Sequence, residues 1–178
     1  MKPFKGERIL LRPLKYSDAD DIYKNARERE VSKWTCNIPY PYTKNDARKF
    51  IKHSILGLRK KQTYIFAIVL NDTGRLVGAI EIKPSHKGGK KGELGYWLGK
   101  PYWGQGIVSE AIKLALIFAF KKLKLHRLSA CVFKENTASK KVLLKNGFKL
   151  EGCFREAHFK FNQWHDIEEY GLIVSDFK

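Results

Sequence analysis

The most informative segment of this sequence is Gly95-Tyr-Trp-Leu-Gly-Lys-Pro-Tyr-Trp-Gly-Gln-Gly-Ile-Val-Ser-Glu-Ala111. A short apolar strand ends at Leu98, a turn with Gly104 and Gly106 follows, and a helix begins at Ile107. Glycine lets the backbone approach a ligand closely, and the amides of a first helical turn have no partners inside the helix. Such a helix start suits a phosphate or pyrophosphate group. An ordinary tight turn between strand and helix would give the same pattern, so this segment alone leaves both interpretations open.

Two familiar phosphate-binding patterns do not fit this turn. No Gly-Lys-Ser/Thr follows it, so it is not a Walker loop. A third glycine is missing where a dinucleotide-binding fingerprint would need it, and the strands before it are expected to be antiparallel.

The flanking sequence predicts strands and helices in mixed order. Asn-Asp-Thr-Gly at 71–74 joins two β-rich runs and favours a hairpin. The expected strands are 7–14, 63–70, 76–82, 93–98, 127–133, 148–155 and 166–174. The expected helices are one that starts after Ser17 or Asp18, then 43–58, 107–123 and 137–146. This order predicts one α+β domain, residues 1–178, built on a single mixed sheet.

The composition is that of a globular protein with a large positive charge. Hydrophobic residues make up 43% of the 178 residues, which excludes a disordered chain. Lys and Arg number 35 against 18 Asp and Glu, a net charge of +17. This charge predicts attraction to anions, but it does not choose among nucleic acid, acidic proteins and phosphorylated small molecules.

The cysteines favour neither a disulfide framework nor a metal site. Cys36, Cys131 and Cys153 are far apart and form no C-x-x-C pair. Cys131 falls within an apolar strand, which predicts a position in the core. No apolar run is long enough to cross a bilayer, and the N-terminus lacks the apolar core of a signal peptide. We therefore expect a cytoplasmic protein with no metal and no membrane attachment.

Several motifs in the same order along the chain carry a family resemblance. They are Arg8-Ile-Leu-Leu-Arg-Pro-Leu14, Gly95-Tyr-Trp-Leu98, Trp103-Gly-Gln-Gly-Ile107, Asn136-Thr-Ala-Ser139, Lys145-Asn-Gly-Phe148 and Leu150-Glu-Gly-Cys153. Together they resemble the GNAT acetyltransferases, specifically the branch that acetylates ribosomal-protein N-termini. The resemblance implies the GNAT fold: a mostly antiparallel mixed sheet flanked by helices, with two strands splayed to bind acetyl-CoA. Pro101 departs from the Gln or Arg that usually opens the family's loop, and Val108 replaces a frequent Ala.

The resemblance assigns acetyl-CoA as cosubstrate and implies which residues hold it. The strand should splay so that backbone groups of Trp97 and Leu98 bond the pantetheine arm. Asn136 matches a residue that contacts the same arm. The amides of the loop and first helical turn should hold the pyrophosphate; these are Gly104, Gln105, Gly106, Ile107, Val108 and Ser109.

The resemblance also implies catalytic candidates. Ser139 stands where the branch places a hydroxyl near the thioester sulfur, and it would protonate the leaving thiolate. His158 aligns with a position that can carry a carboxylate base, and Glu93, just before the splayed strand, is the other candidate. An α-amine, with a pKa near ~8, needs only a mild base, so a water relay is an alternative. Each of the three side chains could instead be purely structural.

The acceptor follows from the resemblance only as a class. The leading interpretation is acetyl transfer to a protein N-terminal α-amine, as on ribosomal proteins. The rivals are a small amine (a polyamine, amino sugar or aminoglycoside) and a nucleic-acid-binding module without enzymatic activity. The charge suggests non-specific association with ribosomes or RNA, for which the loop with Lys87, Lys90 and Lys91 is the first candidate. A homodimer is common in the family, but the sequence leaves the oligomeric state open. The loop at 34–42 resembles the acceptor side of the family.

Overall fold

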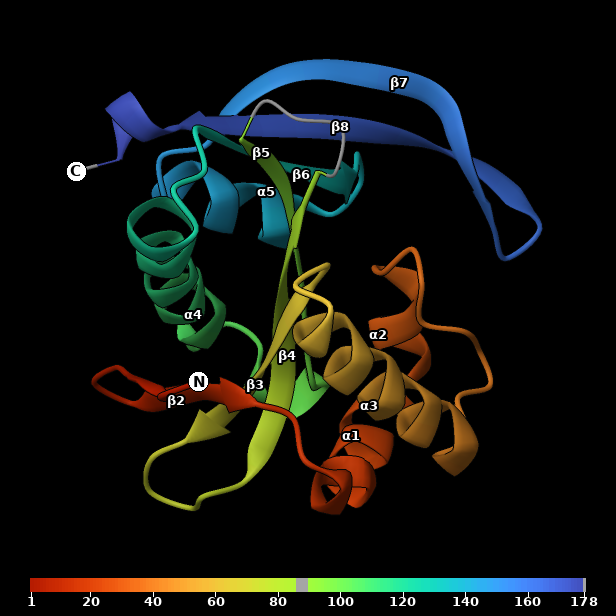
Figure 1. Ribbon diagram of the computed structural model, residues 1–178. Coiled ribbons are helices and arrows are strands. Elements are labelled where there is room, and N and C mark those ends of the chain that lie inside the picture. Colours follow the sequence, from red (N-terminus) through yellow and green to blue (C-terminus); the bar gives the residue numbers. More distant parts are fainter. Residues whose placement is uncertain (86–89, 178) are drawn as a thin grey trace.

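The computed structural model describes residues 1–85 and 90–177, which form one eight-stranded sheet between two groups of helices (Figure 1). The strand order is β1-β2-β3-β4-β5-β6-β8-β7. Its strands are β1 (Phe4–Lys5), β2 (Ile9–Pro13), β3 (Tyr64–Leu70), β4 (Leu76–Pro84), β5 (Lys91–Leu98), β6 (Arg127–Phe133), β7 (Lys149–Lys160) and β8 (Gln163–Ile173). All neighbouring strands are antiparallel except β5 and β6, which run parallel. The predicted mostly antiparallel mixed sheet is confirmed.

The helices cover the two faces of the sheet separately (Figure 1). One face carries α4 (Ile107–Ile117) and α5 (Thr137–Lys145), and the other carries α1 (Ala19–Ala26), α2 (Arg29–Lys33) and α3 (Lys44–Arg59). Because β3 and β4 are buried on both faces, they read as nearly continuous apolar runs rather than as alternating ones. The sheet therefore separates two hydrophobic cores.

The strands β5 and β6 pair over only a short distance. Their parallel register covers residues 91–93 of β5 against 127–129 of β6, and it stops there. The rest of β5 stays paired with β4, while β6 stays paired with β8. The sheet is consequently open between the two strands beyond Glu93.

The C-terminal hairpin is longer than the sequence predicts. The strands expected at 148–155 and 166–174 extend instead to Lys160 and from Gln163. Phe161 and Asn162 form the turn with positive φ angles of 49° and 61°. Much of β7 is exposed and contains two register shifts, so its hydrophobic alternation is interrupted and gives a weak strand signal.

Two other boundaries differ from the prediction. The helix expected at 107–123 is α-helical only to Ile117, and residues 118–122 form a π-helical turn. The strand expected at 93–98 begins earlier, because β5 already starts at Lys91, so Lys91 belongs to the strand and not to the loop before it. Lys87 lies outside the described residues.

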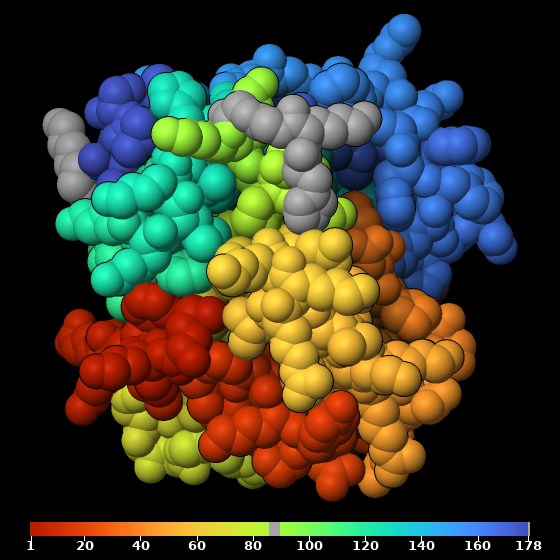
Figure 2. All heavy atoms as spheres, viewed as in Figure 1, coloured from red at the N-terminus to blue at the C-terminus, as the bar shows by residue number. Residues whose placement is uncertain are grey.

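The hairpin tip contacts the N-terminal helical region, and Figure 2 shows the two segments in contact at the edge of the molecule. Lys160 Nζ donates to the carbonyl oxygens of Thr35 and Ile38, the latter at 3.0 Å. The rings of Tyr40 and Phe161 lie 6.2 Å apart. Burial lowers the pKa of Lys160, which is consistent with its enclosed position against these carbonyls. The hairpin is thereby fixed beside α2 and the loop that follows it.

Candidate active site

A cleft of about 490 Å³ passes through the opening between β5 and β6. On one face of the sheet it is lined by the loop after β5 and by α4 and α5. On the other side its lining includes Val31, Trp34 and Thr35, from α2 and the residues directly after it. Of the predicted binding residues, all except Gln105 line this cleft. Two substrates could therefore meet in the opening from opposite faces of the sheet.

The loop between β5 and α4 contains two left-handed glycines directly before the start of the helix. Gly104 and Gly106 adopt left-handed φ angles of 74° and 76°, and a Cβ at Gly104 would meet nothing within 4 Å. In α4 the amide of Glu110 bonds the Gly106 carbonyl at 3.2 Å. The amides of residues 107–109 precede this first helical bond, so they remain available to a ligand at the helix start.

A distant arginine holds this loop in place. Arg8 Nη1 donates to the Gln105 carbonyl at 2.8 Å, and its backbone amide and Nε bond the Glu110 carboxylate at 3.0 and 3.2 Å. Gln105 itself donates its side-chain amide to the Pro101 carbonyl at 2.9 Å. Sequence reasoning did not assign Arg8 to the site, since about a hundred residues separate it from the loop.

The strand register decides which backbone groups of β5 face the opening. The Gly99 amide donates to the Val77 carbonyl of β4, and the Lys91 carbonyl accepts from the amide of Ser85, directly after β4. In an antiparallel ladder every second residue bonds the same neighbouring strand. The polar backbone groups of Trp97 therefore point toward β4, which corrects the expectation that they are free. Those of Tyr96 and Leu98 point toward the opening. The Leu98 carbonyl accepts the Trp103 indole N–H at 2.7 Å, which leaves the Leu98 amide available.

The Ser139 hydroxyl lies in the cleft and is held by a neighbouring phenol. The Tyr96 hydroxyl lies 2.6 Å from Ser139 Oγ. Burial raises the pKa of Tyr96 to about 12, so the phenol keeps its proton at neutral pH. Asn136 caps α5, and its Oδ1 accepts the Ser139 amide at 3.1 Å. Tyr96 was not identified as a site residue from the sequence, because its partner is 43 residues away.

The two candidate bases do not line the cleft. Glu93 is the last residue of β5 in register with β6, where it faces Ser129. His158 pairs with His165 across the hairpin, and its ring contacts that of Phe133 with a centroid distance of 5.3 Å. Burial, together with Lys160 and His165, lowers the pKa of His158, so its imidazole is neutral at neutral pH and able to accept a proton. The structure thus leaves the assignment of the base a prediction.

The prediction that Cys131 belongs to the core is wrong. Its neighbours Ala130 and Val132 face the core, whereas Cys131 is exposed on the alternate face of β6 and lines the cleft. Surrounding atoms nevertheless raise the pKa of its thiol by desolvation.

The electrostatic environment of the cleft suits an anionic ligand. Lys141 and Lys145 of α5 line it beside the glycine loop.

In the described part of the chain, no group of three His, Cys, Asp or Glu residues is placed to hold a metal ion. None of the helices within the described residues is both long and apolar enough to cross a membrane.

Comparison with known proteins gives one consistent family. Residues 8–149 match the Acetyltransferase (GNAT) domain family. The Bacillus subtilis (strain 168) protein named "Probable N-acetyltransferase YjcK" is 33% identical over 177 residues, covering 97% of each chain. The ribosomal-protein-serine acetyltransferase of Escherichia coli (strain K12) is 30% identical over 132 residues, covering 74% of this chain and 73% of that protein.

A solved structure agrees with this comparison. The GNAT-family acetyltransferase from Bacillus anthracis superposes with a TM-score of 0.84 at 28% identity, over 97% of this chain and 98% of that one. The sequence motifs, the splayed sheet and the glycine loop are thus parts of one family pattern. The protein belongs to the GNAT family of acetyltransferases and is an N-acetyltransferase.

Proposed function

We propose that the protein transfers the acetyl group of acetyl-CoA to the α-amine of a protein N-terminus, with ribosomal proteins as the acceptor class. The observation that carries this proposal is the cleft that crosses the sheet between β5 and β6. Its α4 side offers amides and lysines for an anionic donor, and its α2 side is open for an amine. The similarity to the Escherichia coli ribosomal-protein-serine acetyltransferase supports the acceptor class.

The donor would lie along the open edge of β5. The amides at the start of α4 would hold the pyrophosphate, and Arg8 would keep their loop in position. The Leu98 amide and the backbone of Tyr96 would bond the pantetheine arm, and Asn136 would contact the same arm. This arrangement would bring the thioester toward Ser139.

The transfer needs no covalent enzyme intermediate. The neutral acceptor nitrogen bonds the thioester carbonyl carbon, the carbon–sulfur bond breaks, and CoA leaves as a thiolate. Ser139 donates a proton to the sulfur and regains one from solvent, while the surplus proton of the amine passes to a base or to water. The net reaction of addition followed by elimination therefore exchanges one amine proton for the acetyl group on sulfur.

The pH dependence tests His158 as that base. An acceptor α-amine must lose a proton near pH ~8, and a catalytic His158 must lose one below its usual pKa of 6.5. As the pH is lowered between these two values, log kcat/KM should fall by one unit per pH unit, because one proton is taken up. At still lower pH it should fall by two units per pH unit, because two protons are taken up. In His158→Gln the steeper, two-proton part of the profile should disappear, while the one-proton part that belongs to the amine should remain. An unchanged two-proton fall in the variant would return His158 to a structural role.

Among the described residues, no Asp or Glu lines the cleft, which argues against a polycationic acceptor. Glu30 pairs with Lys100 at 2.8 Å, and Glu168 pairs with Lys140 at 3.3 Å. A groove for a polyamine would need carboxylates free of such partners. The net charge of +17 would instead hold the enzyme near ribosomal RNA by counterion release.

A thiol-release assay distinguishes the acceptor classes. With acetyl-CoA as donor, N-terminal peptides of ribosomal proteins should release CoA faster than spermidine, glucosamine or an aminoglycoside. The same peptides with a blocked N-terminus are the matched controls and should be inactive. A small amine that exceeds every peptide in kcat/KM would overturn the assignment.

A further inference from the structure

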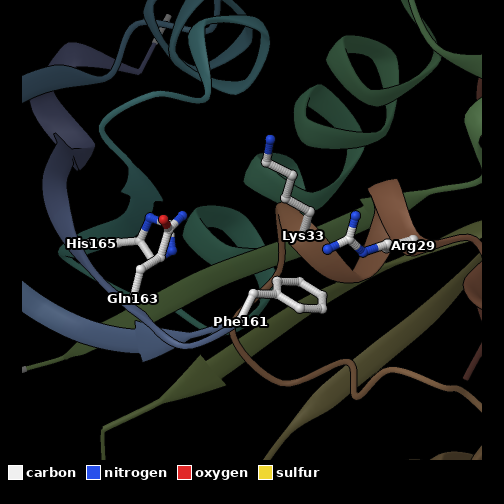
Figure 3. Close-up of a pocket in the computed structure, with 5 residues that line it drawn as sticks. All are labelled: Arg29, Lys33, Phe161, Gln163 and His165. Atoms are coloured by element: carbon white, nitrogen blue, oxygen red, sulfur yellow. The ribbon is translucent and has the colours of Figure 1, made fainter.

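A second pocket, of about 210 Å³, lies between α2 and the tip of the β7–β8 hairpin. Figure 3 shows Lys33 and Arg29 of α2 on one side of it, with Gln163 and His165 of β8 opposite and Phe161 below. The two sides of the pocket come from α2 and from the hairpin, which lie more than a hundred positions apart in the sequence. No part of the catalytic arrangement described above uses this pocket.

The pocket is cationic and keeps its charges free. Arg29 and Lys33 are four residues apart, so they share one face of α2. Their side chains stack on aromatic rings, Arg29 on Phe161 at 5.1 Å and Lys33 on Trp34 at 4.7 Å. Among the ion pairs of the described residues, neither cation takes part in one.

One carboxylate approaches the pocket from outside it. Glu135 Oε2 lies 3.9 Å from His165 Nδ1, and it belongs to the half-exposed segment after β6. The other ring nitrogen of His165 lies 3.3 Å from the Lys160 carbonyl and donates to it. Glu135 thus approaches the imidazole of His165 and is not paired with Arg29 or Lys33.

The pocket and the cleft share α2 as a common wall. Val31 and Trp34, with Thr35 just after the helix, line the cleft, while Arg29 and Lys33 line the pocket. The Lys33 ammonium lies over the ring of Trp34, so the two spaces adjoin at this helix, and one helix diameter, ~10 Å, is taken as the span between them. An extended peptide covers that distance in about three residues. Lys160 bonds the Thr35 carbonyl, so the hairpin side of the pocket is tied to the same wall.

We propose that this pocket binds an acidic side chain of the acceptor peptide, about three residues after the amine that is acetylated. The inference rests on the proposed function and specifies its substrate class further. One guanidinium and one ammonium group, neither of them paired with a carboxylate of the described residues, favour a carboxylate ligand, and the aromatic rings hold them in place. Acceptors with a lysine at that position should be disfavoured by like charge.

The test compares three peptides that differ only at residue four, which is glutamate, glutamine or lysine. For the wild-type enzyme we expect the glutamate peptide to have a KM about fivefold to tenfold lower than the glutamine peptide, with similar kcat. The lysine peptide should be the poorest. In the double variant Arg29→Gln/Lys33→Gln, the three KM values should converge while kcat and acetyl-CoA binding stay unchanged.

A second double variant controls for net charge. Lys121→Gln/Lys122→Gln removes the same charge from the exposed turn after α4 and should keep the wild-type preference. Thermal denaturation and acetyl-CoA binding establish that each variant is folded. Two results would overturn the proposed binding of an acidic side chain in this pocket and leave the proposed function intact. One is equal KM values for the three peptides in the wild type, and the other is a preference that survives in Arg29→Gln/Lys33→Gln. Failure of all three peptides as acceptors would overturn both.

Discussion

A carboxylate at position 106 should eliminate the stabilisation of the protein by acetyl-CoA. Gly106 precedes the first turn of α4 at φ 76°, which strains any other residue, and its side chain would extend into the region proposed for the pyrophosphate. The added negative charge would oppose the phosphates. A Cβ there would also lie 3.4 Å from Arg8 Nη2, so Gly106→Glu would draw Arg8 away from the loop carbonyl that it now bonds.

The measurement is the shift in Tm on adding acetyl-CoA, which follows from mass action when only the folded state binds. The wild type should show a rise that grows with ligand concentration, and Gly106→Glu should show none. Gly74→Glu is a matched control, since Gly74 lies in the β3–β4 turn at φ 66° with open space around it. It carries the same strain and charge but should retain the full shift. A normal shift in Gly106→Glu would remove the loop from the donor site.

Ser139→Ala should lower kcat about 100-fold, the usual contribution of a positioned proton donor. The affinity for acetyl-CoA should stay near that of the wild type, because the hydroxyl acts on the leaving group. The substitution keeps the backbone amide that Asn136 caps, so the start of α5 is preserved. Turnover from thiol release and affinity from calorimetry measure the two effects separately. Unchanged turnover would mean that water protonates the thiolate.

Tyr96→Phe separates positioning from proton donation within the same pair. It removes the hydroxyl that lies 2.6 Å from Ser139 Oγ but keeps the ring that packs against the core. We expect a decrease in kcat of about tenfold, and a double variant no worse than Ser139→Ala, because the two groups act as one unit. A larger loss in Tyr96→Phe than in Ser139→Ala would make the phenol the proton donor.

Local sequence patterns predicted most of the elements in their order, but not β1 or the short helix α2. Gly104 and Gly106, which the sequence marks as a turn, adopt the left-handed φ angles that glycine tolerates where the chain turns from β5 into α4. Asn136 is an N-cap residue by type, and it caps α5 as its residue type favours. The family motifs then gave the splayed strands, which spacing alone does not show.

The parts of the site that the sequence did not predict depend on contacts between distant residues. Arg8 reaches the loop across 97 residues, and Tyr96 reaches Ser139 across 43, and neither pair leaves a periodic signal in the sequence. The direction of the Trp97 backbone depends on the register with β4, which only the folded sheet fixes. The length of the hairpin was hidden because β7 is exposed and bulged, so it lacks a clean alternation of apolar residues.

The architecture explains how one short break in a sheet can serve two substrates. Because β5 and β6 separate after residue 93, a ligand on the α4 side and one on the α2 side can meet within the sheet. The hairpin is held to the α2 region by Lys160, and its tip lines the second pocket beside α2. Changes in α2 and the hairpin tip are therefore expected to alter acceptor choice without altering donor binding.

The most direct test of this account is to locate the acetyl group on the product. A ribosomal-protein N-terminal peptide that also contains an internal lysine is incubated with the enzyme and acetyl-CoA, and the product is sequenced by tandem mass spectrometry. The account predicts acetyl on the α-amine alone, with spermidine in the same reaction left largely unmodified. Acetyl on the lysine side chain, or spermidine consumed before the peptide, would contradict it.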